Sequence, residues 1–157
     1  MPAGPANPPL GLQLADTART ISRAFDDALT AAGGSRPTWL VLMALKKQPT
    51  ANQRQLAAAV GIQGATLTHH LNAMESAGLL TRRRDPANRR VHLVELTEHG
   101  ENAFHDLRRA AVAFDEQLRS GLDTDDVERL RDLLARLQAN VAGPRDSGHQ
   151  PGEAPTA

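Results

Sequence analysis

The sequence predicts a mainly α-helical fold with one small β-hairpin, and three patterns point to it. Apolar residues recur every three or four positions over residues 12–32 and again over residues 98–141. Two shorter helical segments with a glycine between them occupy residues 52–76. Two basic segments of strand-like composition then flank a proline turn at residues 85–89. A chain of 157 residues is long enough for one domain with a core, which we expect over residues 10–142.

The formal net charge is zero, but the charges are unevenly distributed along the chain. Residues 50–92 hold six arginines and two acids, a net charge of +4, so the rest of the chain carries −4. A basic middle between acidic flanks is typical of a DNA-binding lobe with a separate dimerisation region. The absence of cysteine excludes disulfides and thiolate chemistry. Without a signal-peptide core or an apolar run of about 18 residues, the expected location is cytoplasmic.

Residues 1–9 are rich in proline, alanine and glycine without periodicity, and we expect them to form a disordered tail. A helix is predicted from about residue 12 to residue 32, because apolar side chains recur on one face at intervals of three and four. Two glycines at positions 33 and 34 end it. The apolar stripe of this helix consists of Leu14, Ala18, Ile21, Phe25 and Leu29.

Residues 35–48 are predicted to form a second helix, which Pro49 stops. Ser35 or Thr38 could cap it, and Pro37 suits its first turn. Its inward stripe is expected to be Leu40, Met43 and Ala44, with Trp39 and Val41 nearby.

Two helices over residues 52–60 and 64–76 follow, with Gly61 as the left-handed residue of the turn between them. In the second of these, Leu67, Leu71 and Met74 share one face and should point inward. At 100° per residue, the opposite face then holds Ala65, His69, Asn72 and Ser76. Gly78 is the predicted C-terminal cap.

Residues 79–84 and 90–96 are predicted as strands joined by the turn at 85–89. Thr97 should cap a long helix with acids in its first turn, and Asp123 or Thr124 should cap another. Both helices carry apolar stripes too extensive for one small lobe to cover, so a homodimer is expected. The tail of residues 143–157 is predicted to be disordered. The two stripes are Phe104, Leu107, Ala111, Phe114 and Leu118, then Val127, Leu130, Leu134, Leu137 and Val141.

The segment from residue 52 to residue 96 therefore has the order of a winged helix-turn-helix, whose second helix enters the DNA major groove. Small and hydroxyl-bearing side chains near the start of that helix could contact base edges and thymine methyl groups. A solvated amphipathic helix is the alternative. The predicted base-reading residues are Ala65, Thr66, Thr68 and His69.

The arginines of the hairpin should neutralise phosphates, and one at its tip could enter an A·T-rich minor groove. The alternative is a hairpin whose charges serve solubility alone. The residues predicted to contact the DNA backbone or act in the wing are Asn72, Arg82, Arg83, Arg84, Arg89 and Arg90.

The segment resembles the MarR family of multiple antibiotic resistance regulators, strongly over residues 50–100 and in element order over about 12–141. The resemblance implies a homodimeric bacterial repressor, with a winged lobe at about 37–97 and dimerisation helices at about 12–32 and 98–141. It also implies that Arg90 is the minor-groove arginine. The family usually has Asp where this chain has Asn88. The matching residues are Gly61, Thr66 to Met74, Glu75-x-x-Gly78-Leu79, Asp85-Pro86-x-Asn88-x-Arg90 and Leu96-Thr97-x-x-Gly100.

In the family, small aromatic or phenolic ligands bind between the dimer helices and the winged lobe. For each corresponding residue here, core packing or a solvated surface is the alternative. The candidate ligand-pocket residues are Phe25, Arg36, Trp39, Met43, Phe104 and Arg108.

We expect no enzyme, no catalytic residue and no cofactor, because phosphate loops, nucleophile elbows and paired carboxylates are missing. The six histidines keep a zinc-responsive regulator as an alternative, although their spacing is not that of a zinc site. A winged-helix module that binds protein, without specific DNA binding, is another alternative.

Overall fold

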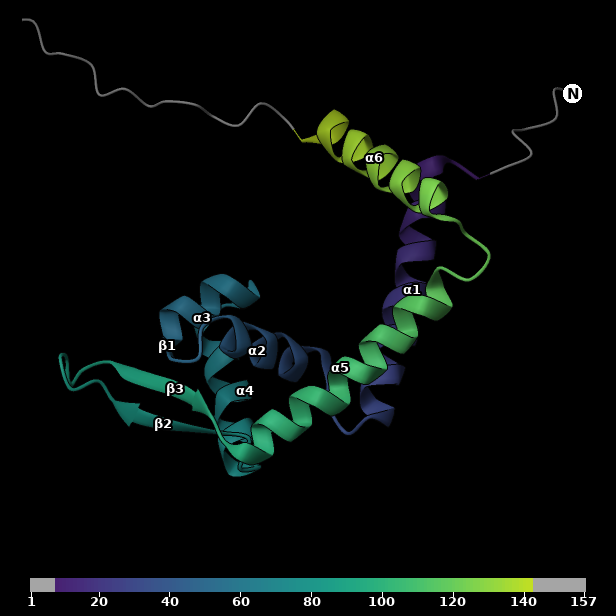
Figure 1. The fold of residues 1–157 in the computed structure, drawn as a ribbon. Helices are drawn as coiled ribbons and strands as arrows, with labels where there is room; N and C mark the ends of the chain where they lie inside the picture. Colours follow the sequence, from purple (N-terminus) through teal and green to yellow (C-terminus); the bar gives the residue numbers. More distant parts are fainter. Residues whose placement is uncertain (1–7, 143–157) are drawn as a thin grey trace, which may run out of the picture. The chain divides into compact units, whose positions relative to one another are not determined.

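The computed structural model describes residues 8–142, and the predicted tails lie outside them except for Pro8 and Pro9. The chain divides into two compact units, one up to Glu116 and one from Gln117 onward. The fold class is the predicted one: six helices and a three-stranded antiparallel sheet within residues 8–142. Figure 1 shows the hairpin extending from the short helices with its turn at the far end.

The first two helices are α1 (Leu10–Ala31) and α2 (Arg36–Lys47). Gly33, at a φ of 84°, turns the chain between them, as a residue without Cβ readily does. Of the two predicted caps for α2, Ser35 is the one found: its hydroxyl accepts a hydrogen bond from the Thr38 N–H.

The helix-turn-helix consists of α3 (Gln53–Val60) and α4 (Gly64–Ser76). A reciprocal capping box starts α3, in which Asn52 Oδ1 accepts from the Gln55 N–H and Gln55 Oε1 accepts from the Asn52 N–H, both at 2.9 Å. Gly61 ends α3 in the left-handed region at a φ of 70°, as its position predicted.

The sheet contains β1 (Ala51–Asn52), β2 (Leu80–Arg84) and β3 (His92–Leu96) in the order β1-β3-β2. The hairpin register pairs Leu80 with Leu96 and Arg84 with His92. The strand β1 was not predicted, because two residues are too few to show alternation. Both hairpin strands begin later than predicted, β2 by one residue and β3 by two.

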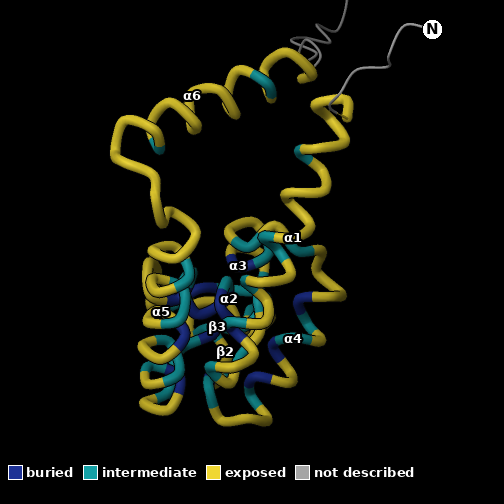
Figure 2. Tube along the Cα trace, turned by 90° about the vertical axis from the view of Figure 1, so that its right-hand side faces the viewer, coloured by how far each residue is buried: buried dark blue, intermediate teal, exposed yellow. Residues whose placement is uncertain are grey.

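The core of the first unit is formed by apolar side chains from α1 to α5 and the sheet, and Figure 2 shows the buried positions gathered there. The predicted inward face of α2 was wrong in part, since Leu42 and Leu45 are buried while Leu40 is only half-buried. Helix α2 contacts α1, α3, α4 and β3, so it is covered on several sides. A single stripe therefore cannot describe it.

The remaining helices are α5 (Glu98–Leu118) and α6 (Thr124–Val141). Asp123 caps α6 in a capping box with Asp126, so the first of the two predicted caps is the one used. In α6, no residue is buried, and Leu130, Leu133 and Leu134 are each more than 40% exposed. Within residues 8–142, no helix combines the length and apolar character that a membrane crossing requires.

Candidate nucleic-acid interface

Helix α4 presents a polar face to solvent, as the spacing of its apolar residues predicts. Leu67, Leu71 and Met74 are buried in the core of the lobe. On the opposite side, the structure leaves four of the predicted DNA-facing residues exposed. They are Ala65, Thr66, His69 and Asn72.

Thr68 differs from the other predicted base-reading residues, because its hydroxyl group already has partners. It is half-buried, donates to the Gly64 carbonyl oxygen at 2.9 Å and accepts from the Gln53 side-chain amide. Gln53, at the start of α3, thus holds the first turn of α4. Sequence reasoning did not select Gln53, although its place directly after the cap of α3 puts it beside the helix turn.

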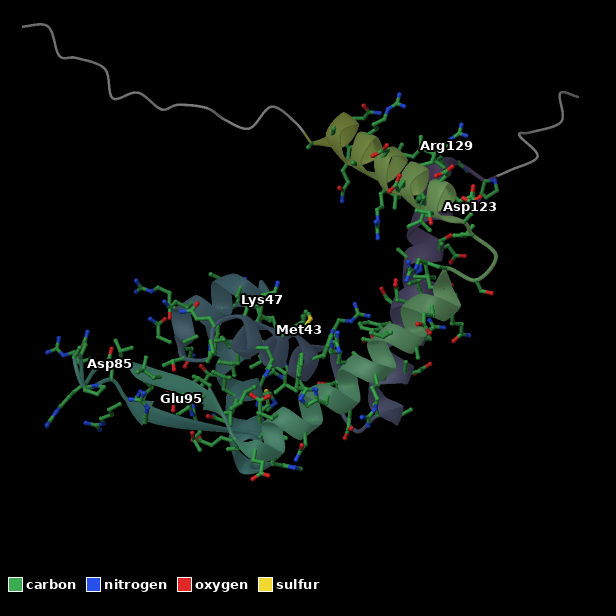
Figure 3. The ribbon with its side chains drawn as sticks, viewed as in Figure 1. Met43, Lys47, Asp85, Glu95, Asp123 and Arg129 are labelled. Carbon is green, nitrogen blue, oxygen red and sulfur yellow. The ribbon has the colours of Figure 1, made fainter. Side chains whose placement is uncertain are left out.

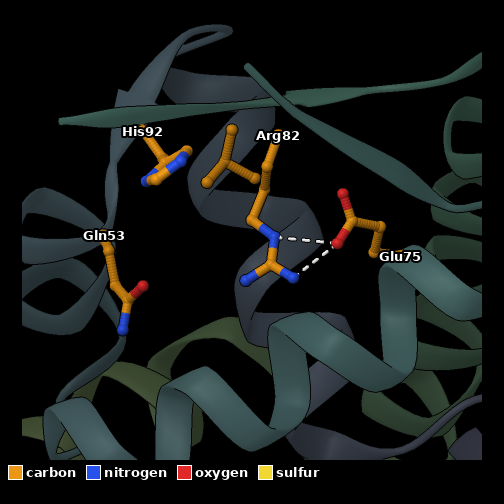
Figure 4. Close-up of a pocket in the computed structure, with 5 residues that line it drawn as sticks. Gln53, Glu75, Arg82 and His92 are labelled. Atoms are coloured by element: carbon orange, nitrogen blue, oxygen red, sulfur yellow. Dashed lines mark hydrogen bonds and ion pairs between the residues drawn. The ribbon is translucent and has the colours of Figure 1, made fainter. Parts of the chain in front are cut away.

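Arg82, predicted to contact DNA backbone, is held by two side chains of α4. Its Nε–H donates to Glu75 Oε2 at 2.9 Å, and Nη2 donates to Asn72 Oδ1 at 2.7 Å. Figure 4 shows Arg82 and Glu75 at a surface hollow. It is lined by Gln53, Glu75, Arg82, His92 and Val94. The hydrogen bonds from Arg82 hold the pKa of the Glu75 carboxyl below its ordinary value, so the acid stays charged at neutral pH.

Arg83 is paired on the other face of the hairpin. Its guanidinium donates to Glu95 Oε1 at 2.7 Å, and the Thr50 hydroxyl donates to the same oxygen at 3.1 Å. These hydrogen bonds lower the pKa of Glu95, and the carboxylate in turn raises the pKa of Arg83. Glu95 therefore joins both hairpin strands to the segment before β1.

The turn of the hairpin is closed by side-chain and backbone hydrogen bonds. Asp85 Oδ1 accepts from the Ala87 N–H at 2.9 Å, and Asn88 Oδ1 accepts from the Arg90 N–H at 3.2 Å. Asn88 thus forms a hydrogen bond in this turn although the family usually has Asp there. In Figure 3, Asp85 lies near the turn and Glu95 farther back along the hairpin. Arg84, Arg89 and Arg90 are exposed, and the described part of the chain supplies none of them with an ion-pair partner.

A cluster of hydrogen bonds joins the end of α4 to the start of α5. The Thr97 hydroxyl donates to the Gly78 carbonyl oxygen at 2.5 Å and accepts from the Gly100 N–H at 3.0 Å. The Thr97 N–H donates to the Leu79 carbonyl oxygen at 3.1 Å. The two short motifs that carry the family resemblance, around Gly78 and around Gly100, are therefore one structural junction.

Five of the six candidate ligand-pocket residues form two groups of packed side chains, and the sixth is exposed. Trp39 is buried and stacks on Phe104 with ring centroids 5.6 Å apart, and Met43 is half-buried against the core. Arg36 lies over the Phe25 ring, 5.7 Å from its centroid, and donates to Asp26 at 2.8 Å. Arg108 is exposed.

Lys46 was missed by sequence reasoning. It lies 5.5 Å from the Phe104 ring centroid and pairs with Glu101 at 2.8 Å.

The histidines do not form a metal-binding cluster in the part of the chain that the structure describes. The rings of His69 and His70 are 5.8 Å apart, but over residues 8–142 no three His, Cys, Asp or Glu side chains converge closely enough to hold a metal ion. His149 lies outside the described residues.

Comparison with known proteins shows which family this geometry resembles. The model of the MarR family matches residues 35–92, which run from the cap of α2 to the start of β3. A solved transcriptional repressor, CouR, bound to a 23-mer DNA duplex, is 26% identical. The fold match covers 82% of this chain and 92% of that one, with a TM-score of 0.73. Over residues 35–92 the chain is therefore similar to the MarR family, and over most of its length its fold is similar to that of a solved DNA-bound repressor.

Two further relatives are transcriptional regulators rather than enzymes. The PcaV regulator of Streptomyces coelicolor, solved in complex with its natural ligand, is 25% identical with a TM-score of 0.72, over 88% of this chain and 100% of that one. The uncharacterized HTH-type regulator YdgJ of Bacillus subtilis (strain 168) is 31% identical over 90 residues, which is 57% of this chain. This match spans 55% of that relative's length.

Proposed function

We propose that this chain is a homodimeric, sequence-specific DNA-binding transcriptional regulator. The observation that carries the proposal is one arrangement: the exposed polar face of α4 lies in the same lobe as an arginine-rich hairpin. A solved relative of the same fold is a repressor bound to DNA. In the proposed complex, α4 enters the major groove with Ala65, Thr66 and His69, and the hairpin follows the backbone toward the minor groove.

Dimerisation is the second part of the proposal. The apolar stripe of α6 contains no buried residue, and Leu10 and Leu12 at the start of α1 are each more than half exposed. Exposed apolar faces of this extent are expected to pair with a second copy. Two copies of α4 related by a two-fold axis would enter successive major grooves about 34 Å apart on a pseudo-palindromic operator.

The third part of the proposal is that the protein is a repressor and that a small molecule releases it from DNA. A relative with the same fold is solved with its natural ligand. Trp39 and Phe104 provide a stacked aromatic pair, with Lys46 over the Phe104 ring. An aromatic or phenolic acid would suit such a set, because the ring can pack against aromatic side chains and the anion can pair with a cation. Such a ligand would release DNA by favouring a subunit arrangement in which the two copies of α4 no longer match the spacing of the grooves. The effect cannot exceed the difference between its affinities for this arrangement and for the DNA-binding one.

The test is fluorescence anisotropy of the purified protein on DNA from upstream of its own gene. For a cytoplasmic regulator of this kind, we expect binding that resists unrelated competitor DNA. The binding should also weaken as the salt concentration increases, because phosphate contacts displace bound cations from DNA. Binding no tighter than to unrelated DNA, on this fragment and on a genome-derived selection library, would contradict sequence-specific regulation. Release from bound DNA by aromatic acids, compared with their uncharged amides, tests the ligand part separately.

A further inference from the structure

Arg82 joins the hairpin to the helix that would enter the major groove. Arg82 is a residue of β2, and its guanidinium binds two residues of α4 that lie seven and ten positions earlier in the chain. Both Nε and Nη2 donate to the same oxygen of Glu75, and Nη2 also donates to Asn72 Oδ1. A planar guanidinium with several fixed N–H donors can hold two side chains in one geometry, which an ammonium group on a flexible stem does less well.

The surroundings of Arg82 set it apart from the other arginines of the hairpin. Its side chain is 23% exposed, whereas that of Arg83 is 49% exposed. A guanidinium that is already hydrogen-bonded to a carboxylate must share or give up that bond in order to neutralise a phosphate. Arg84, two residues farther along the same strand, is exposed and has no such bond within residues 8–142.

The hydrogen bond from Arg82 also determines which way the Asn72 amide faces. A guanidinium has no acceptor, so only the carbonyl oxygen of Asn72 can face it. The amide Nδ2, with two N–H donors, is then directed away from Arg82 on an exposed residue. Two donors suit a phosphate oxygen or a purine N7, whereas reading adenine with both ends of the amide would also require Oδ1.

We propose that Arg82 is a positioning residue of the DNA interface, which sets the hairpin against α4 through Glu75 and directs the Asn72 donors outward, and which does not itself neutralise a phosphate. This inference rests on the proposed DNA-binding function. It separates Arg82, which holds the hairpin against α4, from the exposed arginines near the turn, which contact DNA.

Glu75→Ala distinguishes a positioning role of Arg82 from a phosphate-binding role, because the two roles predict opposite changes in operator affinity. If Arg82 acts through Glu75, operator affinity falls by about tenfold, the scale of a lost charge-assisted hydrogen bond. Arg82→Ala combined with Glu75→Ala then costs no more than Arg82→Ala alone. If Arg82 were a phosphate ligand, Glu75→Ala would release it and remove a negative charge near DNA, so affinity would rise. Tighter binding by Glu75→Ala would overturn the proposal.

The salt dependence of operator binding provides a second measurement, with Arg84→Ala as the matched control. Each phosphate contact contributes about 0.9 to the slope of log affinity against log salt. We expect Arg82→Ala to weaken binding at an unchanged slope, and Arg84→Ala to reduce the slope by about 0.9. An equal loss of slope in both variants would contradict the positioning role.

A third measurement needs no DNA and separates this inference from the proposed function. Backbone ¹⁵N relaxation of the free protein should show larger hairpin motions over residues 85–91 in Arg82→Ala and Glu75→Ala than in wild type or Arg84→Ala. Unchanged hairpin motion would overturn the positioning role even if DNA binding is confirmed. If the variants show increased hairpin motion but the protein binds no specific DNA, the proposed function is wrong and the role of Arg82 in positioning the hairpin is still supported.

Discussion

At the scale of single residues, Gly100 shows how tightly the two halves of the winged lobe are joined. It is buried in the first turn of α5, and a Cβ placed there would lie 1.9 Å from the Leu79 carbonyl oxygen. That oxygen is a backbone atom that also accepts from the Thr97 N–H, so it cannot move aside freely. The glycine is therefore required for packing at this junction rather than for an unusual backbone angle.

Gly100→Ala should lower the free energy of unfolding by about 1–3 kcal/mol or more, because overpacking forces the backbone to shift. Urea unfolding followed by circular dichroism measures the change. Gly64→Ala is the matched control, since nothing lies within 4 Å of a Cβ at that position of α4. The control should be neutral or more stable by up to about 1 kcal/mol, since alanine favours a helix over glycine. Equal stability of Gly100→Ala and wild type would show that the junction tolerates a side chain.

Arg90 is the residue on which the minor-groove contact depends in the proposed complex. Arg90→Ala should weaken operator binding by about 1–3 kcal/mol, chiefly on operators with A·T-rich flanks, where a narrow minor groove favours an arginine. Anisotropy on operators with A·T-rich and G·C-rich flanks measures the difference. Arg109→Ala, which removes an exposed arginine from α5, serves as the control and should leave affinity unchanged. An identical loss on both flanks would assign Arg90 to the backbone instead.

At the scale of elements, the hairpin is stabilised by an acid on each face. Glu75 holds Arg82 from α4, and Glu95 holds Arg83 from the neighbouring strand while accepting from Thr50. Each carboxylate must be ionised to accept these hydrogen bonds at full strength. The anchoring of the hairpin therefore depends on pH on the acid side.

The pH dependence of stability should reveal the Glu95 contribution. Its pKa in the folded protein lies below the ordinary value of 4.5, so its stabilisation is complete well above pH 4.5 and is lost as the pH falls through the lowered pKa. Unfolding free energies of wild type and Glu95→Gln should thus differ at neutral pH and converge in acid, at one fixed protein concentration. Glu116→Gln, an exposed acid of α5, is the control. A difference that stays constant down to low pH would contradict this role of Glu95.

At the scale of the whole molecule, the apolar stripe of α6 is the feature that a single copy leaves unexplained. No residue of this helix is buried, although its stripe repeats every three or four positions like a helix-packing surface. Exposed leucines of this number carry a hydration cost that pairing with another chain would remove. We therefore expect the stripe to lie in the interface of the proposed homodimer.

Leu130→Asp combined with Leu134→Asp should shift the protein from a dimer toward a monomer of 16.8 kDa, because two carboxylates would have to be buried in the interface. Sedimentation equilibrium measures the mass, and circular dichroism shows whether the variant is folded. Ala139→Asp places one carboxylate on the opposite face of α6 and should remain dimeric. If the double variant stays dimeric, the interface lies elsewhere.

Features that depend on neighbours a few residues away could be predicted from the sequence. Helix periodicity, the left-handed Gly61 and the outward face of α4 follow from spacing within three or four residues, and the structure contains them. Spacing narrowed the caps of α2 and α6 to two residues each, and the structure selected Ser35 and Asp123. The arginine run marked the hairpin for the same reason. These local patterns sufficed to predict the fold class and the exposed residues of the candidate DNA-binding face.

Which side chains meet across the lobe depends on the tertiary structure. The two-residue strand β1, the buried face of α2, and the partners of Arg82 and Arg83 could not be obtained from spacing. Thr50 and Glu95, for example, are 45 positions apart and meet because β1 pairs with β3. A charge run in the sequence shows how many arginines there are. Only the packing of the elements places an acid beside one arginine and leaves another exposed to solvent, because it brings distant segments within hydrogen-bonding distance.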